Sequence, residues 1–169
     1  QLAPLKLIIG EIFPLQAKQG YPTVLRRPYA MLKYFSTMST TPTSPKTVLI
    51  HFDWSLARFK EALEKEDTKY YRGAALQRFS LTYDLIIKAI RSFAEEQNTT
   101  CSNDASCFEW AVNHRWLKND SGWKKMAKNY ITTLGQPADA TADQVFAELP
   151  KYYHLMSHLR RQMETTPHR

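Results

Sequence analysis

Residues 69–97 read KYYRGAALQRFSLTYDLIIKAIRSFAEEQ and hold the longest regular pattern of the chain. Apolar side chains recur there at steps of three and four residues, a spacing that a β-strand does not produce. The pattern predicts one helix over 69–97, roughly 40 Å long at about 1.5 Å per residue. The apolar stripe consists of Leu76, Phe79, Tyr83, Ile86, Ile87, Ile90, Phe93 and Ala94.

Two shorter helices are expected on either side of this stretch. The earlier one is predicted to begin near Asp53, whose carboxylate can accept hydrogen bonds from the free amides of a first turn. The later one is predicted over 105–117, with Asp104 or Ser106 as its cap. The apolar faces comprise Leu56, Phe59 and Leu63 in the earlier helix and Phe108, Ala111, Val112 and Trp116 in the later one.

Two more helices follow a predicted turn at 118–122 (KNDSG). The fourth is expected to begin at Ser121 and to stop before the Gly-Gln-Pro at 135–137. The fifth is expected from Thr141, which forms a capping-box pattern with Gln144. Pro150 lies inside it and should kink or restart the helix. The stripes are Trp123, Met126, Ala127, Tyr130, Ile131 and Leu134, and then Val145, Phe146, Leu149, Tyr152, Tyr153, Met156, Leu159 and Met163.

Helices with short connections and no strand pattern predict an all-α fold, a four- to five-helix up-down bundle. The low glycine content, five in 169 residues, agrees with this. We place the bundle in residues 47–169 and expect residues 1–46 to be a poorly ordered N-terminal extension.

The N-terminal extension differs from the rest in composition. It holds six of the nine prolines, and residues 1–47 carry six basic residues and one acid, a net charge of +5. The remainder has 17 basic and 15 acidic residues, so the net charge of +7 says little about nucleic-acid binding by the bundle. The extension fits a targeting peptide, a basic arm, or upstream sequence before a true initiator at Met31 or Met38; we favour the last.

The sequence contains no glycine-rich phosphate loop, no HExxH and no CxxC. Cys101 and Cys107 are too few for a disulfide framework, and we interpret them as unrelated thiols beside a loop, in keeping with a reducing cytoplasm. The apolar stretch at 2–15 is too short and interrupted to span a membrane. His154 and His158 share a helix face but have no third ligand nearby, which favours a solvated face.

The charged residues show no evident acid/base pair. Glu64, Asp67 and Asp104 lie near predicted helix ends, where capping and solvation account for them. A lysine cluster is predicted to form a solvated face, with a phosphate contact as the alternative. It consists of Lys124, Lys125 and Lys128.

The segment 75–90 (ALQRFSLTYDLIIKAI) resembles the long helix of the nucleotidyltransferase substrate-binding protein family, chiefly through QRF at 77–79 and TYDL at 82–85. Residues 107–117, 121–129 and 141–163 are similar to the family's later helices. The resemblance implies a bundle of the wider HEPN group that associates with a minimal nucleotidyltransferase. It further implies no cofactor of the chain's own, because nucleotide and Mg²⁺ would be held by the partner's carboxylates.

Related helical proteins are RNase toxins in which an Arg and a His, with four to six residues between them, lie at the end of the fourth helix. If Asn129 aligns with the family's Asn, Lys128 occupies the Arg position and Thr133 the His position. The resemblance therefore disfavours RNase activity. It leaves three hypotheses: a non-catalytic substrate-binding partner subunit, which we favour, an RNase toxin, and a degenerate relic.

Under the subunit hypothesis, the polar residues of the motifs are the candidates for binding substrate or partner: Gln77, Arg78, Tyr83, Lys128 and Asn129. Arg78 could contact phosphate or an acidic partner surface, and the Tyr83 hydroxyl needs a hydrogen-bond partner if it is buried. Alternatively, Gln77 and Arg78 satisfy one another or neighbouring helix ends. We also expect self-association, as a homodimer or within a heterotetramer, because some aromatics exceed what a small core needs: Trp110, Trp116, Trp123, Tyr70 and Tyr71.

Overall fold

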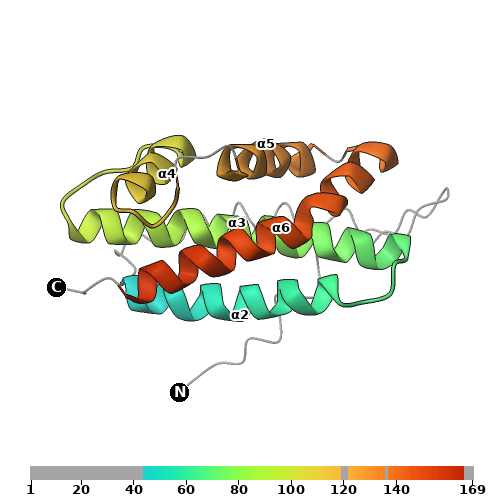
Figure 1. The fold of residues 1–169 in the computed structure, drawn as a ribbon, viewed down its shortest axis with the longest axis horizontal. Helices are drawn as coiled ribbons and strands as arrows, with labels where there is room; N and C mark the ends of the chain where they lie inside the picture. The colour runs from blue at the N-terminus through green and yellow to red at the C-terminus, as the bar shows by residue number, and fades with distance from the viewer. Residues whose placement is uncertain (1–43, 119–121, 136, 166–169) are drawn as a thin grey trace, which may run out of the picture. The chain divides into compact units, whose positions relative to one another are not determined.

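The computed structural model describes residues 44–118, 122–135 and 137–165, and within them every regular element is a helix (Figure 1). The all-α prediction is confirmed. Most of the extension at 1–46 and of the turn at 118–122 lies outside the described residues. The helices are α2 (Pro45–Leu63), α3 (Lys69–Glu96), α4 (Asp104–Asn113), α5 (Gly122–Leu134) and α6 (Asp139–Glu164).

Helix α3 lies at the centre of the bundle and contacts each of the other four described helices. Its bounds agree with the predicted helix to within a residue. Phe79, Ile86 and Ile90 on its stripe are fully buried. The Phe79 ring meets Phe59 of α2 at 6.1 Å between centroids and Tyr152 of α6 at 5.4 Å. One face of one long helix therefore organises the core.

Helix α2 begins eight residues before the predicted start at Asp53. Ser44 is its N-cap residue and Pro45 opens the first turn, where a missing N–H costs nothing. Val48 and Phe52 in the added turns are buried. Asp53 instead accepts two hydrogen bonds from the Arg160 guanidinium, at 2.6 and 2.7 Å, which ties α2 to α6.

The caps of α4 and α6 also differ from prediction. Asn103, rather than Asp104 or Ser106, caps α4, and its side chain and that of Ser106 form a reciprocal capping box. Helix α6 begins at Asp139 without a side-chain cap, so Thr141 lies inside the helix. The helix continues through Pro150 and bends along its course without restarting (Figure 1).

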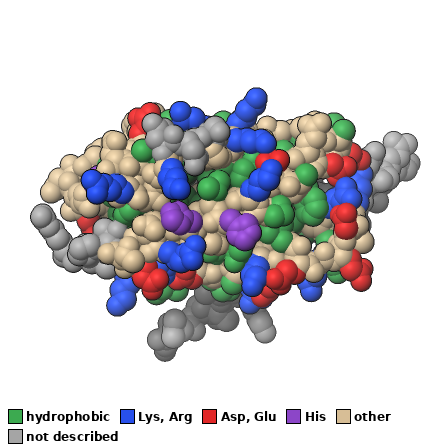
Figure 2. All heavy atoms as spheres, in the orientation of Figure 1, with side chains coloured by type: hydrophobic (Ala, Val, Ile, Leu, Met, Phe, Trp, Pro, Cys, Tyr) green, Lys and Arg blue, Asp and Glu red, His purple; other side chains and the backbone are tan. Residues whose placement is uncertain are grey.

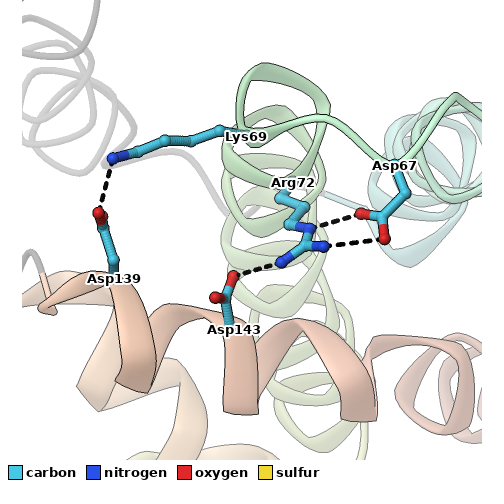
Figure 3. Close-up of polar contacts among 5 residues, drawn as sticks. All are labelled: Asp67, Lys69, Arg72, Asp139 and Asp143. Atoms are coloured by element: carbon cyan, nitrogen blue, oxygen red, sulfur yellow. Dashed lines mark hydrogen bonds and ion pairs between the residues drawn. The ribbon is translucent and has the colours of Figure 1, made fainter.

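Ion pairs join the start of α3 to the start of α6 (Figure 3). The Arg72 guanidinium donates to both oxygens of Asp67 and to Asp143 at 2.8 Å, and its plane lies over the Phe146 ring. Lys69 and Asp139 form a second pair at 2.6 Å. The Arg72 pairs hold the pKa of Asp67 below its usual value. Asp67 is therefore a structural partner of Arg72 rather than a merely solvated acid.

The surface carries fewer aromatics than predicted. Trp110, Trp116 and Trp123 are 6%, 3% and 7% exposed, so the expectation that they line an interface is wrong. Tyr70 is exposed as expected, whereas Ile131, placed on the apolar stripe of α5, is 68% exposed. No described helix is both long and apolar enough to cross a membrane.

The ends of α3 and α4 each use a residue in the left-handed region. Asn98 has φ 55° and Arg115 has φ 63°. At both helix ends the amide of the following residue donates a hydrogen bond to the carbonyl five residues earlier. Thr99 donates to Ala94, and Trp116 donates to Ala111. This Schellman arrangement suits glycine or asparagine, so the conformation is strained at Arg115.

Replacing Arg115→Gly should therefore raise the free energy of unfolding by about 1 kcal/mol, because glycine adopts positive φ without a Cβ clash. Thermal unfolding of the full chain measures this. Arg115→Ala is the control, since it removes the same side chain but keeps the Cβ. Equal melting temperatures for the glycine and alanine variants would contradict the assignment.

Candidate functional site

A stacked pair of tyrosines joins α3 to α5. The Tyr83 and Tyr130 rings lie 4.0 Å apart between centroids and 16° from parallel. Tyr83 also packs against Phe108 of α4, at 5.9 Å. The fixed rings leave each hydroxyl only a small range of positions, so the polar groups around them are held in place.

Each hydroxyl of this pair donates to a carboxylate. Tyr130 donates to Oδ1 of Asp84 at 2.5 Å, and Tyr83 donates to Oδ2 of Asp104 at 3.1 Å. Asp84 belongs to α3, and Asp104 is the first residue of α4. We call these four residues the tyrosine–carboxylate cluster. The role predicted for Asp104, capping or solvation, is corrected: it accepts the hydrogen bond of a buried tyrosine.

Burial changes the proton affinities within the tyrosine–carboxylate cluster. The pKa of Asp84 is raised above its usual value, first by desolvation, with the Tyr130 hydrogen bond opposing it and the negative charge of Asp104 adding to it. The pKa of Tyr83 is also raised, first by burial and then by the charge of Asp104. Asp84 is thus the described carboxylate best placed to take up a proton, and raised pKa values of this kind gather at functional sites as well as in cores.

The five candidate residues do not form one site. Tyr83 is buried and belongs to the tyrosine–carboxylate cluster. Asn129 is half-buried and donates to the Tyr152 hydroxyl at 2.7 Å, which holds α5 against α6. Burial and the charge of Glu148 raise the pKa of Tyr152 to about 12. Asn129 therefore has a structural partner.

Gln77, Arg78 and Lys128 lie at the surface. Gln77 and Lys128 are exposed and Arg78 is half-buried. No hydrogen bond or ion pair joins the Gln77 or Arg78 side chain to another described residue. The alternative in which these two side chains satisfy one another is therefore wrong within the described part of the chain.

Thr133, at the position of the family's His, has its hydroxyl engaged within the bundle. It donates to the Tyr130 carbonyl at 2.6 Å and shares a 2.9 Å hydrogen bond with Ser80 of α3. The residue thus packs α5 against α3. The Lys128 side chain is exposed and makes no comparable contact. Lys128 and Thr133 therefore do not form a paired site like the Arg and His of the RNase toxins.

The two cysteines are both buried and free, and they are not unrelated. Burial raises the pKa of Cys107 to about 12, and a hydrogen bond with Cys101 adds to the shift. High pKa values keep thiols protonated and unreactive. Among the described residues, no group of three or more His, Cys, Asp or Glu side chains could hold a metal ion.

The sequence did contain a signal for the residues that were missed. Asp84 follows Tyr83 directly and interrupts an otherwise apolar run in the middle of the longest helix. A carboxylate there needs a donor from another element. Spacing within one helix cannot name that donor, because Tyr130 is 46 residues away.

Comparison with known proteins relates the chain to a family. The sequence profile described as nucleotidyltransferase substrate binding protein like matches residues 48–165. Among solved structures, the chain is similar to a crystal structure of a protein from Thermus thermophilus, with 23% identity and a TM-score of 0.62. That similarity covers 66% of this chain and 98% of the other, and it supports the fold alone. Comparison with curated proteins gives no match.

The raised pKa of Asp84 predicts a pH-dependent stability difference between the wild type and Asp84→Asn. The folded state holds the proton more tightly than the unfolded state, whose value is near 3.8. The protonated Asp84 therefore contributes its full stabilisation of the folded state below the unfolded-state pKa. This contribution is lost as the pH rises through the pKa of Asp84 in the folded state. Melting temperatures measured from about pH 4 to pH 8 should shift in favour of Asp84→Asn as pH rises.

Tyr130→Phe sharpens this test. This substitution removes the hydrogen bond that lowers the pKa of Asp84, so the pKa of Asp84 should rise further. The pH range over which the wild-type Asp84 loses stability relative to Asn should then extend to higher pH. Curves for wild type and Asp84→Asn that run parallel across the range would show that Asp84 titrates alike in both states.

Proposed function

The chain belongs to the nucleotidyltransferase substrate binding protein-like family, and from this premise we propose that it is a non-catalytic subunit that associates with a minimal nucleotidyltransferase and helps to hold its substrate. The observation that carries the proposal is the family match, which runs over 48–165 and includes most or all of each described helix. The partner supplies the nucleotide and Mg²⁺ sites in this proposal.

An apolar surface on α2 supports docking of that partner. Ile50 and Trp54 are 63% and 58% exposed and stand four residues apart on one helix face. The Arg58 guanidinium lies 5.8 Å from the Trp54 ring centroid, and Glu61 accepts two hydrogen bonds from it. Exposed Trp and Arg side chains of this kind dominate binding energy in many interfaces.

A basic side chain on α3 supports contact with an acidic surface or a phosphate. Arg78 is half-buried, so its stem is held by the bundle while its guanidinium has no described partner. An ion pair with a partly held arginine gains more binding free energy than one with a fully solvated arginine, because the held side chain loses less conformational entropy on binding. A buried hydroxyl pair, Ser55 with Thr82 at 2.8 Å, holds α2 against α3 beneath this region.

Co-expression with the minimal nucleotidyltransferase of the same genome tests the proposal. We expect one complex in size-exclusion chromatography with light scattering, and the measured mass distinguishes a heterotetramer from a heterodimer. Separate elution of the two proteins would overturn the subunit role and leave a relic bundle. RNA cleavage by the purified chain would instead revive the RNase hypothesis, which the positions of Lys128 and Thr133 disfavour.

Variants locate the docking surface. Trp54→Ala should weaken the complex by about thirtyfold or more, because truncating a central aromatic anchor costs roughly 2 kcal/mol or more. Tyr70→Ala is the matched control, since Tyr70 is a 73% exposed aromatic on another helix. Arg78→Ala should also weaken binding while the melting temperature stays within a few degrees. An equal effect of Trp54→Ala and Tyr70→Ala would exclude α2 as the docking face.

A further inference from the structure

One buried side chain anchors the connection between α3 and α4. This connection covers residues 97–103 and forms an open arc at the left of Figure 1. Cys101 is buried, whereas the other residues of the connection are exposed and polar: Gln97, Asn98, Thr99, Thr100, Ser102 and Asn103. Figure 2 shows this end of the molecule chiefly in tan, the colour of the backbone and of uncharged polar side chains. Cys101 is therefore the side chain that ties the connection to the core.

The two ends of the connection are fixed by hydrogen bonds, and its middle is not. The Thr99 amide donates to the Ala94 carbonyl at the end of α3, and Asn103 forms the capping box with Ser106 at the start of α4. Within the described part of the chain, no hydrogen bond engages the backbone of residues 100–102. Segments held by few contacts open at low free-energy cost, so these three residues can open while both helices stay folded.

The anchoring thiol meets a second thiol in the core. Cys107 lies in the first turn of α4 and is 0% exposed, Cys101 is 4% exposed, and a hydrogen bond joins the two thiols. Five residues lie between them, and the capping box turns the chain within that interval. The pair resembles a hydrophobic staple, in which a residue before the cap packs on one in the first turn. A small shift of residues 100–102 is then enough to bring the two sulfur atoms to bonding distance.

A cation lies beside the second thiol. Burial is the largest influence on the pKa of Cys107 and raises it, while the charge and hydrogen bond of the Arg91 guanidinium act to lower it. The Nε atom of Arg91 is buried and has no hydrogen-bond partner among the described residues. A positive charge with a donor to spare favours a thiolate over a thiol. Arg91 is therefore placed to stabilise Cys107 when it gives up its proton.

We propose that Cys101 and Cys107 form a reversible disulfide site, which a low-molecular-weight disulfide such as glutathione disulfide oxidises when the α3–α4 connection opens. In the closed structure both thiols are covered and do not react. Opening of residues 100–102 exposes Cys101, which is the entry thiol, while Cys107 stays in the core as the resolving thiol. The proposal concerns this chain alone and does not rest on its role as a subunit.

The oxidation takes place in two exchange steps. The Cys101 thiol loses its proton to solvent, and its sulfur attacks glutathione disulfide, which forms a mixed disulfide and releases one glutathione thiolate. When the connection closes, the Cys107 thiolate attacks the Cys101 sulfur and expels the second glutathione thiolate. The two released thiolates take up the two protons. Two cysteine thiols are thus oxidised to one disulfide, and one glutathione disulfide is reduced to two glutathione molecules.

The new bond would join the connection covalently to the first turn of α4. The first residue of that turn is Asp104, which accepts the hydrogen bond of Tyr83. A disulfide that closes a short loop restricts the unfolded chain, so the oxidised protein should be the more stable form. Oxidation would therefore strengthen the attachment of α4 to the bundle.

Incubation of the full chain with glutathione disulfide at about pH 8, where exchange is fast for an accessible thiol, tests the site. We expect the intact mass to fall by two hydrogen atoms, both thiols to disappear from a thiol assay in denaturant, and the melting temperature to rise by roughly 5 °C. A reductant should reverse all three changes. The same incubation in denaturant shows that the reagent is active. Free thiols in the folded chain after complete oxidation of the denatured chain, or a lasting glutathione adduct, would overturn the proposal.

Single cysteine variants test the order of the two steps. Cys107→Ser should accumulate one glutathione adduct, because Cys101 can still open but has no resolving thiol. Cys101→Ser is the matched control and should stay unmodified, because Cys107 remains covered. Adducts that form at equal rates on the two variants would contradict entry at Cys101. Melting temperatures of both variants establish that they are folded.

Arg91→Gln tests the positioning role of the guanidinium. The second step should slow about threefold, because a smaller thiolate fraction is partly offset by a more nucleophilic sulfur, and the mixed disulfide should become detectable by mass. Arg161→Gln is the matched control, since it removes an exposed positive charge on α6. Equal rates of closure in the two variants would exclude Arg91 from the reaction.

Discussion

The structure depends on burying one face of α3 along its length. Two neighbouring turns of that face carry Phe79 and Tyr83, and their rings meet rings from every other described helix. Phe59 of α2 and Tyr152 of α6 pack on Phe79, while Phe108 of α4 and Tyr130 of α5 pack on Tyr83. Aromatic contacts of this kind add specific geometry to area burial, so they fix the helices in both position and rotation.

The same packing explains why polar groups occur inside the bundle. Once Tyr130 stacks on Tyr83, its hydroxyl can reach Asp84, and the hydroxyl of Tyr83 can reach Asp104. Each of these two hydroxyls thereby finds an acceptor on another helix, which removes the desolvation cost of leaving it unpaired. The tyrosine–carboxylate cluster consequently serves the fold, and the burial that this packing imposes is the main cause of the raised pKa of Asp84.

The side chains proposed to bind a partner lie outside this core. Helix α2 presents Ile50 and Trp54, and α3 presents Arg78. These two surfaces differ in chemistry, since the first is apolar and the second is basic. Under the proposed function, the apolar surface on α2 docks the partner, and Arg78 contacts a phosphate or an acidic surface.

The sequence predicted the helices well where many turns contributed to one pattern. The helix over 69–97 was found to within a residue, and the family resemblance carried by QRF and TYDL agrees with the profile match. Helix starts were less well predicted. Helix α2 begins after Ser44, which makes no side-chain capping hydrogen bond, and Asn103 caps α4 where Asp104 or Ser106 was expected. A helix start is a local feature that several neighbouring residues can supply. The burial of side chains on the shorter helices was also partly mispredicted.

Ile131 fits the apolar stripe of α5 by spacing, yet it is exposed, because the face of α5 that carries Tyr130 packs against α3. Residue spacing identifies the apolar stripe of a helix, but the neighbouring helices determine how much of that stripe is buried.

By itself, the sequence determined the helical class, the central helix and the family, because each follows from periodicity or from a motif within one segment. Only the tertiary structure decided which polar side chains meet. Tyr130 and Asp84 are 46 residues apart, and Arg160 and Asp53 are 107 apart. No local pattern encodes such pairs, since they form only after the helices have packed and brought donor and acceptor together.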